Sequence, residues 1–213
     1  MESLYIKNCL MHYKSKIEPE ELEALPIAEF DGEIFLISSI DETYYEAIEY
    51  LKSQKIIGFD TETKPTFVAN SKRNMVALLQ LSGKDRAYIF RLNLIGLPIE
   101  LQKILSTTKI IKVGAAIHDD IKSLQFYHKF TQKSFVDLQS IVSNWGIQDK
   151  SVRKLAGIIL GVRVSKSQQL SNWEATELSP AQISYAAIDA WVCQRMYLKL
   201  LSTPLVKKEI VNE

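Results

Sequence analysis

The chain has 213 residues, of which 46% are hydrophobic and 24% charged, and its formal net charge is +1. This composition suits one globular domain with a substantial core, and it excludes a strongly basic protein that attracts nucleic acid through its overall charge. The only two cysteines, Cys9 and Cys193, stand far apart, which favours free thiols in a reducing compartment. No apolar run approaches the roughly 18 residues of a membrane span, so we expect a cytoplasmic protein that does not enter a membrane.

The chain begins with an extension over residues 1–32, which we expect to be partly flexible. Within it, "EPEELEALP" predicts a short acidic helix closed by Pro26. Residues 33–202 carry strong periodic patterns without a linker-like cluster of glycine or proline, which indicates one domain. We expect residues 203–213 to form a loose C-terminal tail.

The first half of the predicted domain is rich in strands. The segment 33–40 has the composition of a strand, and 41–54 has apolar residues at helical spacing behind Asp41, a good N-cap. Three apolar strands with short connections then follow over 55–62, 75–82 and 86–92. Short connections of this kind favour an antiparallel meander.

The second half alternates helices and strands and then becomes helical. The predicted elements are a helix over 98–107, a strand over 109–117, a helix over 119–128, a short strand running into a helix over 134–146, and helices over 151–161 and 179–201. Asp137 and Ser179 are expected N-caps, and Gly161 is an expected helix end. We expect Trp173 and Trp191 to lie in the core rather than to serve as stacking platforms. This order predicts an α/β fold with a mixed sheet covered by helices.

Several acidic residues lie at positions where helix capping or a salt bridge could account for some of them but not for all. Asp60 and Glu62 lie one residue apart at a strand end, so both project from the same face. Asp120 follows a strand at the start of a helix, where it or Asp119 can also act as a helix cap. Asp189 lies among small apolar residues in "YAAIDAW", where an unpaired buried carboxylate would destabilise the fold. Asp60 and Glu62 alone can also be explained as a salt-bridged strand end.

Carboxylates from three separate elements favour a site for hard divalent cations. Clustered carboxylates repel one another, and Mg²⁺ or Mn²⁺ removes that repulsion because both ions prefer oxygen ligands. A carboxylate cage for two such ions is a device for phosphoryl transfer. Tyr185 precedes Asp189 by four positions and shares its helical face. The histidines lack the spacing of zinc ligands, and we give no role to His118 beside Asp119.

These motifs resemble those of the DEDD superfamily of 3′–5′ exonucleases, in the subgroup with a tyrosine in the third motif. This subgroup includes ribonuclease D and the Werner-type exonuclease domain. The first motif matches "FDTET", the second "KVGAAIHDDIKSL" and the third "YAAIDA", with "SNWE" before the third. The resemblance extends from about residue 33 to residue 200. It implies an RNase H-like fold with a mixed five-stranded sheet flanked by helices.

The resemblance also implies the roles of the acids. Two divalent cations, Mg²⁺ or Mn²⁺, are expected, with Asp60 bridging them. Glu62 and Asp189 are expected to hold the ion that activates water, and Asp120 rather than its neighbour to hold the second ion. Tyr185 is expected to orient the attacking water. The implied partner is DNA or RNA with a free 3′ end, and the implied products are nucleoside 5′-monophosphates.

The expected substrate-binding residues are Thr63, Lys64, Phe67, Met75 and Lys166. The resemblance implies that the backbone amide of Thr63 meets the terminal 3′ hydroxyl, although Thr63 can equally be an ordinary strand residue. Lys64 and Lys166 are expected to meet phosphates, and a surface lysine without contact to substrate is the alternative for Lys166. Phe67 or Met75 is placed to wedge against the terminal base. For the segment from Lys64 to Met75, a solvated loop without contact to substrate is the competing interpretation.

The chain ends soon after the third motif, which predicts a stand-alone exonuclease domain. Two alternatives remain open at this stage. One is a phosphodiesterase acting on dinucleotides or short oligonucleotides, and the other is a catalytically inactive domain that binds nucleic acid. The sequence does not choose between DNA and RNA, because no reader of the 2′ hydroxyl is visible.

Overall fold

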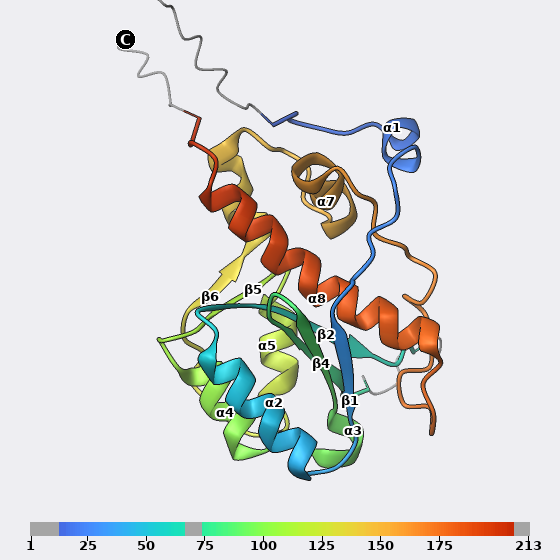
Figure 1. The fold of residues 1–213 in the computed structure, drawn as a ribbon, viewed down its shortest axis with the longest axis vertical. Helices are drawn as coiled ribbons and strands as arrows, with labels where there is room; N and C mark the ends of the chain where they lie inside the picture. The colour runs from blue at the N-terminus through green and yellow to red at the C-terminus, as the bar shows by residue number, and fades with distance from the viewer. Residues whose placement is uncertain (1–12, 67–73, 207–213) are drawn as a thin grey trace, which may run out of the picture.

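The structure is a computed structural model that describes residues 13–66 and 74–206. Its elements in chain order are α1 (Pro19–Glu23), β1 (Glu33–Ile37), α2 (Glu42–Ser53), β2 (Ile56–Thr63), β3 (Val76–Ser82), β4 (Arg86–Arg91), α3 (Leu92–Ile95), α4 (Ile99–Ser106), β5 (Ile111–Gly114), α5 (His118–Leu124), β6 (Phe135–Asp137), α6 (Leu138–Ile141), the 3₁₀ helix η1 (Val142–Trp145), α7 (Val152–Leu160) and α8 (Pro180–Leu201). Figure 1 shows how they are arranged.

The described strands form one mixed sheet in the order β1-β4-β3-β2-β5-β6. Strands β2, β3 and β4 pair antiparallel, as the predicted meander requires. Strands β1 and β4, β2 and β5, and β5 and β6 pair parallel. The sheet therefore has six strands among the described residues, whereas the family resemblance implied five. The short strand predicted ahead of Asp137 is present as β6 and pairs with β5 at the sheet edge.

Helices cover both faces of this sheet (Figure 1). One face packs against α2, α4 and α5 through a core that includes Tyr44, Leu101 and Leu124. The other face carries α8, with α7 packed against the C-terminal half of that helix. Strand β3 lies inside the sheet and is buried along its whole length. This burial explains why its sequence reads as an almost unbroken apolar run.

Local signals in the sequence set several helix boundaries. The side chain of Asp41 accepts a hydrogen bond from the amide of Tyr44 at 3.1 Å, which confirms the predicted N-cap. Ser179 and Gln182 form a reciprocal capping box at the start of α8. Gly161 ends α7 with φ of 72°, a conformation that glycine adopts without strain. The strand predicted over 109–117 is shorter than expected, because the chain turns at Ala116 with φ of 59°.

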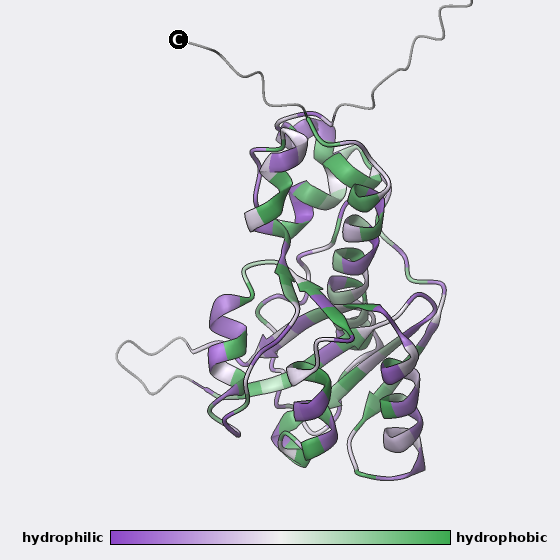
Figure 2. Ribbon diagram, turned by 90° about the vertical axis from the view of Figure 1, so that its left-hand side faces the viewer, coloured by the Kyte–Doolittle hydropathy of each residue, from purple (hydrophilic) through white to green (hydrophobic). Residues whose placement is uncertain are grey.

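The hydropathy of the residues follows these layers. Along the helices, hydrophobic and hydrophilic segments alternate, as expected for helices with one buried and one exposed face (Figure 2). Among the described helices, none is both long and apolar enough to cross a membrane.

The described part of the N-terminal extension packs against α7 and the turn that follows it. The amide of Ala28 donates to the carbonyl of Arg163 at 2.9 Å, and the amide of Arg163 donates to Pro26 at 2.8 Å. Glu23 of α1 forms an ion pair with Arg153 of α7. The predicted short acidic helix is present as α1 and buries Leu22.

Helix α8 lies close against β2 at a glycine. A Cβ atom added at Gly58 would lie 1.9 Å from the carbonyl oxygen of Ala190. Ala186, Ala187 and Ala190 are fully buried along the same part of α8. Small residues on both elements therefore allow the helix backbone to lie directly on the strand.

Replacing Gly58 by alanine is expected to lower the free energy of unfolding by about 3 kcal/mol, because backbone rather than a flexible side chain must move. Urea unfolding measures this change. Gly157→Ala on α7 is the matched control, because its added Cβ meets the tip of the Leu22 side chain, which can rotate, and because alanine favours a helix. Equal losses in the two variants would contradict the proposed close approach.

Candidate active site

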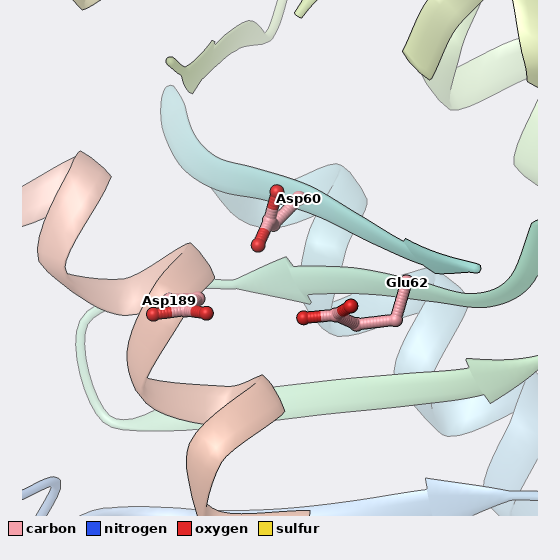
Figure 3. A group of neighbouring side chains, drawn as sticks. All are labelled: Asp60, Glu62 and Asp189. Carbon is pink, nitrogen blue, oxygen red and sulfur yellow. The ribbon is translucent and has the colours of Figure 1, made fainter. Parts of the chain in front are cut away.

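Three carboxylates meet where β2 passes under α8. Asp60 and Glu62 project from one face of β2, and Asp189 reaches them from α8 (Figure 3). One oxygen from each side chain lies within 4.8 Å of the other two. The two-residue period of β2 places the first two acids together, and the small-residue contact at Gly58 brings the third within reach.

Burial and mutual repulsion shape the electrostatics of this group. Burial, followed by the charges of Asp189, Glu62 and Asp120, raises the pKa of Asp60 well above its usual value. Burial and the same repulsion from Asp189 and Asp120 raise the pKa of Glu62 to about 9. Burial raises the pKa of Asp189 to about 7, against the opposing effect of a hydrogen bond from Tyr185. Positive charge bound among these acids would offset both burial and repulsion and favour their charged forms.

Tyr185 completes the site from the same helix. Its hydroxyl donates a hydrogen bond to the Asp189 carboxylate, and burial with nearby negative charge raises the pKa of that hydroxyl. The ring of Tyr185 packs beside that of Trp173, with ring centroids 5.9 Å apart. Trp173 is fully buried, which confirms its prediction as a core residue, and Trp191 is partly buried against the core on the same face of the sheet.

Arg91 holds the loop that carries Trp173. This side chain is only 4% exposed. Its guanidinium donates to the carbonyl of Thr176 at 2.7 Å and to the carbonyl of Ala175. A charged group buried against backbone carbonyls ties the end of β4 to the segment just before α8. The position of Tyr185 thus depends on contacts that lie far apart in the sequence.

Asp120 lies beside the group of three rather than inside it. Its carboxylate accepts a hydrogen bond from the hydroxyl of Thr61 at 2.5 Å. It is close enough for its charge to raise the pKa of both Asp60 and Glu62. By contrast, Asp119 is 69% exposed and lies 3.8 Å from Lys122 in an ion pair on the helix surface. The structure therefore places Asp120, not its neighbour, next to the acids of β2.

Three of the expected substrate-binding residues lie at the end of β2, directly after it, or directly before β3. Thr63 is the last residue of β2 and follows a shift in the register with β3. Lys64 forms an ion pair with Glu174, 3.5 Å apart, in the "SNWE" segment. Met75 precedes β3 and is 44% exposed. Phe67 lies outside the described residues.

Lys166 is exposed in the segment between α7 and α8. Its charge helps to lower the pKa of Glu23 in the N-terminal extension, after the larger effect of Arg153. It does not join the group of acids within the described part of the chain.

The chemistry of the donor set fits hard divalent cations. The grouped atoms are carboxylate oxygens from Asp60, Glu62 and Asp189, with no histidine or cysteine among them in the described residues. Mg²⁺ and Mn²⁺ prefer such oxygen ligands. The half-buried position strengthens the interaction between these acids and a cation compared with an exposed site. The arrangement can therefore bind cations that would also contact phosphate oxygens.

Sequence reasoning missed the residues that support the acids. Gly58, Thr61 and Arg91 act through contacts between distant elements, and no local pattern marks them. Gln80 was detectable, because it is the single polar residue within the apolar run "MVALLQL". A polar residue inside a fully buried strand indicates a specific polar neighbour.

Comparison with known proteins identifies the class to which this fold and site belong. A profile of the 3′–5′ exonuclease family matches residues 35–203. The crystal structure of the Aedes aegypti Nibbler EXO domain superposes with a TM-score of 0.71 and 25% identity, covering 79% of this chain and 87% of that one. The chain belongs to the 3′–5′ exonuclease family, within the DEDD superfamily with its RNase H-like fold.

Among curated relatives, Exonuclease 3′-5′ domain-containing protein 2 of Drosophila melanogaster is 33% identical over 176 residues, which is 78% of this chain and 30% of that protein. The Bifunctional 3′-5′ exonuclease/ATP-dependent helicase WRN of Mus musculus is 28% identical over 209 residues, covering 93% of this chain and 15% of that protein. This chain thus spans less than a third of the length of these two relatives.

Proposed function

We propose that this chain is a metal-dependent exonuclease that hydrolyses nucleic-acid phosphodiester bonds from the 3′ end and releases nucleoside 5′-monophosphates. The observation that carries the proposal is the group of three carboxylates within 4.8 Å, with Tyr185 bonded to one of them, in a chain of this family. A Trypanosoma brucei ribonuclease D solved in complex with RNA U12 shares the fold, with a TM-score of 0.67 and 18% identity.

The acids supply the ligands in this proposal. Asp60, Glu62 and Asp189 would hold two divalent cations, Mg²⁺ or Mn²⁺, with Asp120 contributing from the side. Bound there, the cations would activate a water molecule and stabilise negative charge on the leaving 3′ oxygen. The Tyr185 hydroxyl lies beside Asp189, where it would hold the attacking water.

The end of β2 would receive the 3′ terminus of the strand. The backbone amide of Thr63 would meet the terminal hydroxyl, and Met75 would contact the terminal base through its exposed side chain. Lys64 is paired with Glu174, but exposed ion pairs are worth only about 0–1 kcal/mol, so a phosphate can replace that partner. Lys166 would meet phosphates farther along the strand, and Phe67 remains a proposed contact.

A ladder assay tests the proposed function. A 5′-labelled strand incubated with Mg²⁺ or Mn²⁺ should give a descending series of products, and EDTA should prevent it. The assay is run in parallel on single-stranded DNA, duplex DNA, RNA and dinucleotides, because these substrates separate the proposal from a short-oligonucleotide phosphodiesterase. A circular single strand, which has no 3′ end, should remain intact. Cleavage of the circle, or no cleavage of any substrate, would overturn the proposal.

Replacing Tyr185 by phenylalanine is expected to slow turnover about 10- to 100-fold, because a hydrogen bond to a charged group is worth about 1.5–3 kcal/mol. The ring and its packing on Trp173 are retained, so cation affinity should change little. Single-turnover rates measure the effect. Tyr197→Phe, farther along α8, is the matched control and should keep the wild-type rate. An unaltered rate for Tyr185→Phe would remove this residue from the mechanism.

A further inference from the structure

Gln80 is a buried polar side chain without a visible structural purpose. It is 1% exposed in the middle of β3. Neither its carboxamide nitrogen nor its carboxamide oxygen has a hydrogen-bond partner among the described residues. Leaving a buried amide unpaired costs about 1–3 kcal/mol. A glutamine at this position therefore needs a partner that apolar packing does not supply.

The sheet register places Gln80 next to the acid cluster. In the antiparallel pairing of β2 and β3, Gln80 lies directly opposite Asp60. Residues that face each other in this way project from the same side of the sheet, with Cβ atoms about 4.5–5.5 Å apart. On the other side of β3, Gln80 lies opposite the apolar Ile89 of β4. Of the two residues directly opposite Gln80 on the neighbouring strands, Asp60 is the polar one.

We infer that Gln80 is a positioning residue for cation binding, whose amide N–H group acts on the Asp60 carboxylate through one bridging water molecule. This inference rests on the proposed cation site. A glutamine suits the task because it supplies a donor without adding charge. A lysine in its place would compete with the cation, and a carboxylate would add to the repulsion. Groups that orient metal ligands in this way typically affect metal affinity about 10- to 100-fold.

The test compares two buried glutamines that face the same helix–sheet interface. Gln80→Met keeps the length of the side chain and removes its hydrogen-bonding atoms. Gln194→Met is the matched control, because Gln194 is 3% exposed and its amide donates to the carbonyl of Ile56 at 2.9 Å, near the start of β2. Mn²⁺ binding is measured by calorimetry without nucleic acid, and thermal stability is measured in EDTA.

Gln80→Met is expected to weaken Mn²⁺ binding about 10- to 100-fold. Its stability in EDTA should be unchanged or higher, because an unpaired amide has been removed. Gln194→Met should lose stability and keep the Mn²⁺ affinity of the wild type. If Gln80→Met does not fold, Gln80→Leu provides the same comparison. Wild-type Mn²⁺ affinity in the Gln80 variant would overturn the inference.

The calorimetric measurement separates this inference from the proposed function. If the wild-type chain binds Mn²⁺ but degrades no nucleic acid, the proposed function fails and the role of Gln80 is still decided by the change in affinity. If the wild-type chain does not bind Mn²⁺, the inference about Gln80 is overturned together with the cation site.

Discussion

Asp60→Asn is expected to reduce the rate of 3′ digestion about a thousandfold or more. Asp60 is one of three carboxylates within 4.8 Å of one another, and after burial the charges of Asp189, Glu62 and Asp120 raise its pKa. Asparagine keeps the shape of the side chain but removes the negative charge that holds a cation. Metal ions supply several kcal/mol of transition-state stabilisation in such sites, and each 1.36 kcal/mol corresponds to tenfold in rate. Turnover of a 5′-labelled oligonucleotide measures the loss.

Neighbouring acids on α5 provide the control for this prediction. Asp119→Asn alters an exposed residue that pairs with Lys122, so its rate should match the wild type. Asp120→Asn should lose most of the activity, because the carboxylate of Asp120 lies beside the cluster. Equal effects at the two positions would contradict the assignment of Asp120. Full activity in Asp60→Asn would remove the carboxylate group from the mechanism.

Stability distinguishes a lost ligand from a damaged fold. Without cations, Asp60→Asn should be as stable as the wild type or more stable, because it removes a buried ionisable group and its repulsion from neighbouring acids. With Mn²⁺, the wild type should gain more stability than the variant, because the variant binds the ion less tightly. A variant that is inactive and also unstable in EDTA would indicate a structural role for Asp60 instead.

Local spacing explains why much of the site could be predicted from the sequence. Asp60 and Glu62 share a face because strands alternate, and Tyr185 and Asp189 share a face because helices repeat every 3.6 residues. The helix caps at Asp41 and Ser179 were predictable for the same reason, since their partners lie within one turn. These features depend on residues that are close in the chain.

The remaining features depend on how distant elements pack, and no local pattern encodes them. The hydrogen bond from Thr61 to Asp120 joins β2 to α5, and Arg91 joins β4 to the loop before α8. The ion pair between Lys64 and Glu174 likewise connects segments far apart in the chain. Strand β6 was expected as a short strand, but its pairing with β5 follows from tertiary structure.

The metal-free protein is expected to lose stability as the pH rises from about 5 to about 8. An acid whose pKa is higher in the folded state stabilises the fold fully below its unfolded pKa and less as the pH rises through the folded value. For Glu62 this interval extends from 4.5 to about 9, and for Asp189 from 3.8 to about 7. Each such group can change the free energy of unfolding by up to about 1.4 kcal/mol per pH unit. Urea unfolding in EDTA at several pH values measures the slope.

Mn²⁺ should reverse this trend, because the ion binds deprotonated carboxylates and its binding releases protons. The stabilisation by Mn²⁺ should therefore be larger at about pH 8 than at about pH 5. Glu62→Gln should flatten the metal-free slope, whereas Glu177→Gln, at an exposed position, should leave it unchanged. Above about pH 8 buried Lys112 acts in the opposite direction, because burial lowers its pKa to about 8. A metal-free stability that is flat or rises between about pH 5 and about pH 8 would contradict raised pKa values of these carboxyl groups in the folded protein.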